Sequence, residues 1–124
     1  MKLTRKIVVL DAPDLEVEST FWAALLGGEV VRDDVDDDWH SITVDGAWTL
    51  GIQLAPDHVP PTWPADGVPQ QLHLDLYVDD IRAAHDEVLA LGAAVLQDAE
   101  DLNAAHGFIV YADPAGHPFC LCWE

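Results

Sequence analysis

The chain has 124 residues, half of them hydrophobic, which suits one compact domain with a sizeable core and excludes a largely disordered chain. Its 23 Asp and Glu against five Lys and Arg give a formal net charge of -18, and such a surface repels nucleic-acid phosphates and anionic lipid headgroups, so neither nucleic acid nor a membrane is an expected partner. The charge is compatible with a cationic ligand, although we favour its interpretation as a solubility or salt-tolerance trait of the source organism.

Residues 3–54 read as a strand, a helix and three further strands. The first strand is expected at Leu3–Leu10, and Asp14 is a suitable N-cap for the helix that follows. Gly27 and Gly28 supply the residue type that ends helices in a left-handed conformation. The apolar residues of this helix recur at helical spacing: Phe21, Trp22, Leu25 and Leu26. The remaining strands of this half are expected at Glu29–Arg32, Trp39–Val44 and Trp48–Leu54.

The same order returns from Leu72. The segment Leu72–Val78 alternates apolar and polar residues, which is typical of a half-buried strand. Asp79-Asp80 then caps a second helix, and Gly92 ends it. The last three strands are expected at Ala94–Leu96, Gly107–Tyr111 and Pro118–Trp123. We therefore predict one domain over residues 1–124, built of two strand–helix–three-strand repeats at about 3–54 and 72–123.

A Pro-rich connection, residues 55–71, joins the repeats and contains five of the eight prolines together with Trp63. It has no apolar periodicity and reads as an extended segment. Two interpretations are open: a plain linker with Trp63 packed on a neighbouring surface, which we favour, and a lid over a cavity.

Several other motifs have ordinary structural explanations. The sequence Asp113-Pro114-Ala115-Gly116 suits a tight turn, and the acidic cluster Asp33–Asp38 lacks calcium-loop spacing and is expected to be a solvated turn. Solvated side chains are the expectation for four histidines: His40, His58, His85 and His106. No Gly-rich phosphate loop follows a strand and no Gly-x-Ser-x-Gly elbow is present, so nucleotide binding and serine hydrolysis have no support.

The order and spacing of these pieces resemble a known superfamily. The pieces that match are Asp14-Leu15, Phe21-Trp22, Leu26-Gly27, His73-Leu74-Asp75, and Phe119-Cys120-Leu121-Cys122. Together they resemble the vicinal oxygen chelate superfamily, which includes glyoxalase I, the bleomycin resistance proteins and the extradiol dioxygenases, and within it the glyoxalase-like branch. The resemblance implies an α+β fold in which two βαβββ modules form a curled mixed sheet around a cavity, with the helices on the outer face.

In such a fold, strand alternation indicates which side chains face the cavity. If His73 faces inward, Asp75 and Tyr77 do so as well, while Leu74 and Leu76 lie under the helices. The candidate ligand-binding residues are Gln53, His73, Asp75, Tyr77, Trp39, Trp63, Cys120 and Cys122.

Metal-dependent members of the superfamily hold a divalent ion with four side chains, which by position fall on Ile7, Gln53, His73 and Cys120. Ile7 cannot coordinate, Gln53 offers a neutral amide oxygen, and Cys120 offers a soft thiolate where hard ions prefer Glu. We therefore expect no cofactor and no stoichiometric transition metal, and we disfavour a divalent metal site. The alternative is a softer zinc site, but buried cysteines usually pack as small apolar side chains. That site would draw on His73, Asp75, Cys120 and Cys122.

The leading interpretation is a cytoplasmic homodimer of the glyoxalase and bleomycin-resistance type that binds a small organic molecule. The acidic surface would suit a cationic drug. The alternative is a lyase or isomerase in which His73 is a general acid/base and Asp75 adjusts its basicity. A metal-dependent glyoxalase or dioxygenase ranks third because its ligand set is broken.

The cytoplasmic location is inferred from two observations. No apolar run reaches the roughly 18 residues of a membrane-spanning helix, and Ile7–Leu10 is too short for a signal-peptide core. Cys120 and Cys122 alternate along an expected strand, where same-face neighbours are poorly placed for a disulfide with each other, so we expect both thiols to be reduced.

Overall fold

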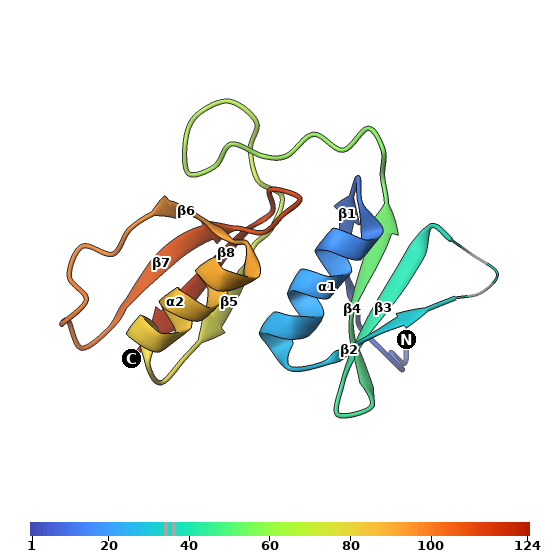
Figure 1. Ribbon diagram of the computed structural model, residues 1–124, viewed down its shortest axis with the longest axis horizontal. Coiled ribbons are helices and arrows are strands. Elements are labelled where there is room, and N and C mark those ends of the chain that lie inside the picture. The colour runs from blue at the N-terminus through green and yellow to red at the C-terminus, as the bar shows by residue number, and fades with distance from the viewer. Residues whose placement is uncertain (34, 36) are drawn as a thin grey trace. The chain divides into compact units, whose positions relative to one another are not determined.

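The computed structural model describes residues 1–33, 35 and 37–124, so two residues of the predicted acidic turn, Asp34 and Asp36, lie outside the described part of the chain. The chain divides into two compact units, Met1–His58 and Val59–Glu124. Each unit contains one strand–helix–three-strand repeat (Figure 1). The predicted α+β class and the two βαβββ modules are confirmed, and each module has its own four-stranded mixed sheet.

The first unit consists of β1 (Val8–Ala12), α1 (Leu15–Leu26), β2 (Glu29–Arg32), β3 (Trp39–Val44) and β4 (Ala47–Leu54). Its strands lie in the order β1-β4-β3-β2, with β1 parallel to β4 and the other pairs antiparallel. The first strand begins later than the expected Leu3–Leu10, because pairing with β4 starts where Val8 meets Leu50.

Helix α1 begins and ends at the residues that the sequence indicates. The carboxylate of Asp14 accepts a hydrogen bond from the amide of Val17 at 3.1 Å, and Gly27 ends the helix with φ 67°. The helix buries Trp22, whose indole donates to the carboxylate of Glu18 at 3.1 Å. Because both side chains are 1% exposed, this hydrogen bond satisfies two polar groups within the core.

The expectation of a solvated His40 is wrong. This side chain lies on the same face of β3 as Ile42, and that face packs against α1, which leaves His40 only 7% exposed. Its Nδ1 lies 2.8 Å from the hydroxyl oxygen of Ser19 on α1. Strand alternation therefore decides its burial, and its position beside the acidic turn does not.

The second unit consists of β5 (Leu74–Tyr77), α2 (Ile81–Leu91), β6 (Ala94–Gln97), β7 (Gly107–Ala112) and β8 (Pro118–Trp123). Its strands lie in the order β5-β8-β7-β6, with β5 parallel to β8. Helix α2 lies across one face of this sheet (Figure 1). On that face His85 contacts the hydroxyl of Tyr111 at 2.9 Å, and Tyr111 stacks on Phe119, so His85 is half-buried and not fully solvated as expected.

None of the helices in the described part of the chain is both long and apolar enough to cross a membrane.

The N-cap of α2 allows a test of how much one capping side chain stabilises the fold. The Asp80 carboxylate accepts from the amides of Arg82 and Ala83, at 3.1 and 3.0 Å. We predict that Asp80→Ala lowers the free energy of unfolding by about 1 kcal/mol, because these two amides lose their partner. Urea unfolding followed by circular dichroism measures the change, and Asp79→Ala, next to it in the chain, is expected to change stability by less than about 0.5 kcal/mol. Equal effects of the two substitutions would contradict the capping role.

Candidate functional site

The face of the second sheet opposite α2 carries the polar side chains that the alternation of β5 predicts. Asp75 and Tyr77 pair across the strands with Cys120 and Cys122 of β8, and these pair in turn with residues of β7. Since directly paired residues point to the same side of a sheet, two rows of side chains lie on this open face. The rows are Asp75, Cys120 and Val110, and Tyr77, Cys122 and Phe108.

A cavity of about 430 Å³ lies over these rows. Its walls combine aromatic rings with acidic and polar groups, and among the described residues that line it there is no Lys or Arg. The aromatic side chains are Trp63, Tyr77, Phe108 and Trp123. The other lining residues are His73, Asp75, His106, Gly107, Cys120, Cys122 and Glu124.

His73, at the entry to β5, is held on three sides. Its Nδ1 lies 2.8 Å from the amide oxygen Oε1 of Gln70, and its Nε2 lies 3.2 Å from a carboxylate oxygen of Asp75. The indole of Trp63 stacks on the imidazole with ring centroids 5.1 Å apart and planes 14° from parallel. The ring is therefore oriented before any ligand arrives, with Nε2 directed at the carboxylate.

Trp63, like Gln70, belongs to the connection and reaches this site. Besides stacking on His73, it packs against the buried cluster of Val110, Cys120 and Cys122. The favoured interpretation of the connection, with Trp63 packed on a neighbouring surface, agrees with this contact. That surface is also the wall of the cavity, so the connection contributes to the site whether or not it moves as a lid.

Both cysteines are buried, reduced thiols. Burial, together with the charge of Asp75, raises the pKa of Cys120 to about 12 and also raises the pKa of Cys122. Repulsion from the ionised form of Cys122 and from the Glu124 carboxylate raises the pKa of Tyr77. At neutral pH the two thiols and the Tyr77 phenol are uncharged hydrogen-bonding groups in the cavity wall, and the thiols are poor nucleophiles.

The remaining predicted ligand residues, Gln53 and Trp39, belong to the first unit. The side-chain amide of Gln53 donates to the backbone carbonyl of Asp38 at 2.9 Å and to its carboxylate at 3.2 Å. The Trp39 indole donates to the hydroxyl of Ser41 at 2.9 Å and lies over Gly51, where an added Cβ would stand 2.3 Å from the ring. Both side chains therefore have local structural partners within their own unit.

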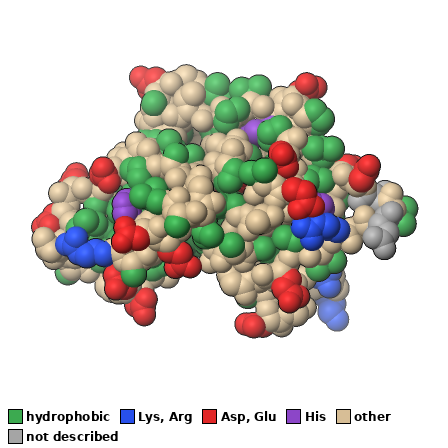
Figure 2. Space-filling model, viewed as in Figure 1, with side chains coloured by type: hydrophobic (Ala, Val, Ile, Leu, Met, Phe, Trp, Pro, Cys, Tyr) green, Lys and Arg blue, Asp and Glu red, His purple; other side chains and the backbone are tan. Residues whose placement is uncertain are grey.

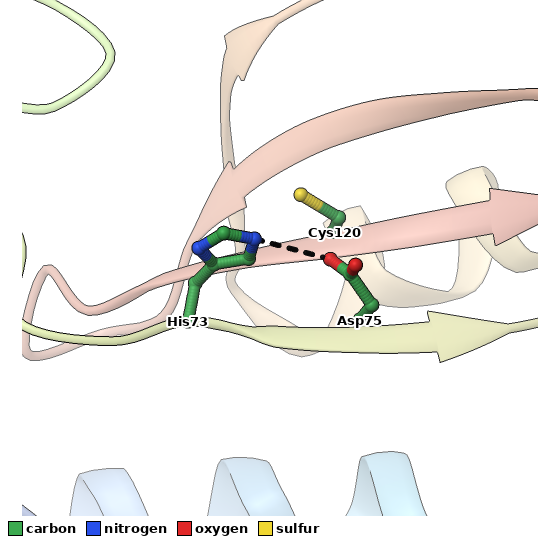
Figure 3. A group of neighbouring side chains, drawn as sticks. All are labelled: His73, Asp75 and Cys120. Atoms are coloured by element: carbon green, nitrogen blue, oxygen red, sulfur yellow. Dashed lines mark ion pairs between the residues drawn. The ribbon is translucent and has the colours of Figure 1, made fainter.

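The metal positions of the superfamily do not fit a hard divalent ion here. Ile7 has no donor atom, and Gln53 offers only a neutral amide oxygen. In the second unit, His73 and Cys120 are joined by Asp75, and the donor atoms of these three side chains all lie within 4.8 Å of one another (Figure 3). Their nitrogen, oxygen and sulfur atoms differ from the oxygen-rich set that such ions prefer.

Four lining residues were not among the predicted ligand residues: His106, Phe108, Trp123 and Glu124. Phe108 could have been found, because it pairs with Cys122 once the register of β7 and β8 is known. Trp123 could not, since simple alternation places it on the other face from Cys122. Its indole donates to the carbonyl of Ala104 at 2.9 Å and lies over Gly107, whose missing Cβ leaves room for the ring.

Comparison with known proteins agrees with this architecture. The family profile described as a glyoxalase-like domain matches residues 7–122. Among curated proteins, no sequence gives a significant match.

Similar solved structures cover nearly the whole chain at low sequence identity. The fosfomycin resistance protein FosX from Listeria monocytogenes has a TM-score of 0.72 at 15% identity, covering 100% of this chain and 95% of that one. A glyoxalase/bleomycin resistance protein/dioxygenase family enzyme from Burkholderia phytofirmans has a TM-score of 0.68 at 12% identity, covering 94% and 95%. An integron cassette protein from the mobile metagenome of the Halifax Harbour sewage outfall reaches 0.65 at 21% identity, covering 95% and 96%. At these identities the likeness concerns the fold.

The raised pKa values predict how stability depends on alkaline pH. Cys120 and Tyr111 each have a folded-state pKa of about 12, above the ordinary values of 9.0 and 10.0, chiefly because of burial. A group whose pKa is raised by folding adds stability below its unfolded pKa and loses it above, so the free energy of unfolding should fall as pH rises past about 9. Urea unfolding between pH 7 and 11 measures this, and Cys120→Ala should flatten the decline between pH 9 and 10. A decline unchanged by that substitution would contradict the assignment to Cys120.

Proposed function

The chain belongs to the glyoxalase-like domain family, and we propose that it is a binding protein for a small organic cation held in the cavity on the open face of the second sheet. The observation that carries this proposal is the composition of the cavity wall. Aromatic faces and carboxylates both attract a cation, and none of the described lining residues is Lys or Arg, which would repel one.

The positions of the carboxylates support a specific mode of binding. Asp75, with a side chain 50% exposed, and Glu124 are reachable from solvent at the cavity, while the faces of Trp63, Tyr77 and Phe108 offer apolar area. A ligand with an aromatic or aliphatic body and an ammonium group could place its body on the rings and its charge at Asp75. This is the usual composition of a small-molecule site, a mainly apolar wall with a few placed polar groups.

The charge of the whole chain supports the same ligand class. Figure 2 shows Asp and Glu side chains spread over the visible face and few Lys or Arg side chains. A net charge of -18 raises the local concentration of cations and speeds their association. Sequestration of a cationic drug or metabolite, which needs no chemistry, is the form we propose for this function.

The contact between His73 and Asp75 favours a second candidate function. A histidine that lies 3.2 Å from a carboxylate in the wall of a cavity is a candidate general acid/base. In that case the protein would be a lyase or isomerase acting on the same ligand class. Mass spectrometry of a bound ligand before and after incubation separates the two functions, because an enzyme changes the mass of its ligand and a binding protein does not. If the protein is an enzyme, His73→Gln should abolish that change.

We also propose that the protein is a cytoplasmic homodimer. The reduced state of Cys120 and Cys122 fits a reducing compartment. Strand β6 is an edge strand of its sheet, and its residues are exposed, including the apolar Val95 and Leu96. Exposed apolar edges are commonly covered by a second chain.

The cation proposal is tested by isothermal titration with the aromatic cation N-methylquinolinium and its uncharged analogue quinoline, in buffer containing EDTA. We expect the cation to bind about tenfold more tightly, because the rings and carboxylates act on its charge. Asp75→Asn should remove most of that preference, while Asp79→Asn, a carboxylate outside the cavity, should keep it. Equal affinity for the two compounds in the unsubstituted protein would overturn the proposal.

The dimer is tested by light scattering coupled to gel filtration at micromolar concentration in physiological salt. We expect twice the mass of the chain. A single-chain mass at this concentration would contradict the homodimer and would leave the cation proposal to be decided by titration.

A further inference from the structure

We infer that His73, Asp75 and Cys120 form a binding site for one thiophilic divalent ion, zinc or cadmium. The inference does not depend on the organic cation of the previous section. It rests on three observations: the mutual distances of the donor atoms, the orientation of the His73 ring, and the chemistry of the donor set.

The donor atoms already converge. Asp75 and Cys120 are direct partners in the parallel pairing of β5 with β8, and their side chains therefore emerge side by side on the open face. Figure 3 shows the His73 ring and the Asp75 carboxylate rising from the same side of the chain, with the Cys120 thiol beside them. All three donor atoms lie within 4.8 Å of one another, and Nε2 of His73 is 3.2 Å from the Asp75 oxygen.

These separations are close to those of a coordinated ion. Ligands at tetrahedral angles and at zinc bond lengths stand about 3.3 to 3.8 Å apart. From separations of up to 4.8 Å, the set therefore has to contract by at most about 1.5 Å, which side-chain rotation can supply. Asp75 is not one of the four metal positions that the resemblance implies, and it lies two residues after His73. It still converges with the other two donors, because strand pairing brings it next to Cys120.

The orientation of His73 is that of a metal ligand. A coordinating histidine usually donates its second ring N–H to an oxygen acceptor, which fixes the tautomer and aims the free nitrogen at the ion. Here Nδ1 lies 2.8 Å from the Gln70 amide oxygen, and Nε2 is left facing Asp75. Gln70 is thus a positioning residue. Trp63 stacks on the imidazole of His73 and restricts the rotation of that ring.

The donor set decides which ion is bound. One imidazole nitrogen, one carboxylate oxygen and one thiolate sulfur suit zinc or cadmium, whereas magnesium, manganese and calcium prefer oxygen ligands. A three-residue site leaves the fourth position to water or a ligand atom, as in catalytic zinc sites. With only three protein donors, and with a thiol proton to release on binding, we expect the ion to exchange during dialysis. The inference departs from the expectation that disfavoured a divalent metal site, and it keeps only the narrower expectation that purified protein retains no stoichiometric transition metal.

The test is a titration of the EDTA-treated and desalted protein with cadmium and zinc, and separately with magnesium and manganese. Cadmium bound to a thiolate produces a near-ultraviolet charge-transfer absorption, which reports on Cys120 without any activity assay. We expect this absorption to saturate at one equivalent of cadmium, zinc to displace it in competition, and the two oxygen-preferring ions to have no effect at tenfold excess.

The variants separate this site from other arrangements. Cys120→Ser should abolish the absorption, while Cys122→Ser, two residues along the same face of β8 and also buried in the cavity wall, should keep it and change affinity less than threefold. Asp75→Asn, at an exposed position, and Gln70→Leu, at a half-buried one, should weaken cadmium binding at least tenfold, and circular dichroism verifies that each variant is folded.

Several results would overturn the inference. Loss of the absorption in Cys122→Ser would assign the ion to a pair of thiols. Unchanged affinity in both Asp75→Asn and Gln70→Leu would remove the proposed ligand and the proposed positioning residue. Absence of cadmium binding by the unsubstituted protein would remove the site, and the titration with N-methylquinolinium in EDTA would still decide the proposed function separately.

Discussion

The parallel pairing of β5 with β8 is the constraint on which the candidate site depends. It sets Asp75 beside Cys120 and Tyr77 beside Cys122, so two strands far apart in the sequence supply one continuous surface. The same pairing places Phe119 and Leu121 on the opposite face, where each is at most 2% exposed. A register shift of one residue would exchange these two faces, burying a carboxylate under the sheet and exposing the core.

The polar groups of the cavity limit one another's charge. The Asp75 carboxylate lies at a wall that also holds two thiols and a phenol, and its charge adds to the burial that keeps Cys120 protonated. Both proposed ligands would bring positive charge to this wall. The organic ammonium would use the rings and the carboxylates, whereas the thiophilic ion would use the sulfur and the imidazole. Both occupants would meet at Asp75, so each should lower the affinity for the other.

Much of the fold could be predicted from sequence because local signals agree with the tertiary structure. Asp14, Asp80, Gly27 and Gly92 mark the helix ends, and alternation in Leu72–Val78 identifies the polar face of β5. The start of β1 could not be predicted, since it depends on where β4 offers a partner. The burial of His40 depends likewise on which face α1 covers, which is a tertiary fact.

The candidate site was predictable where it follows the strand period and unpredictable where it does not. His73, Asp75, Tyr77 and both cysteines share one face by alternation, and the structure brings them to one cavity, although their roles in binding are still predictions. Trp123 enters through the space above Gly107, and Gln70 reaches His73 from a loop. Neither contact has a sequence signal, because each depends on the path of the chain outside the regular elements.

The place of Trp63 means that the repeat unit and the functional unit of this chain are different segments. If the second half is defined by sequence repetition, it begins at the segment that contains His73. If it is defined by the residues that line the cavity, it begins earlier, because the indole of Trp63, which packs on His73 and the two thiols, comes from the connection. The duplication that the sequence displays therefore supplies the framework, while the non-repeated connection supplies a wall. Changes in the length or rigidity of that connection can alter what the cavity accepts while both repeats stay intact, which gives the fold a way to diversify its ligands without altering either sheet.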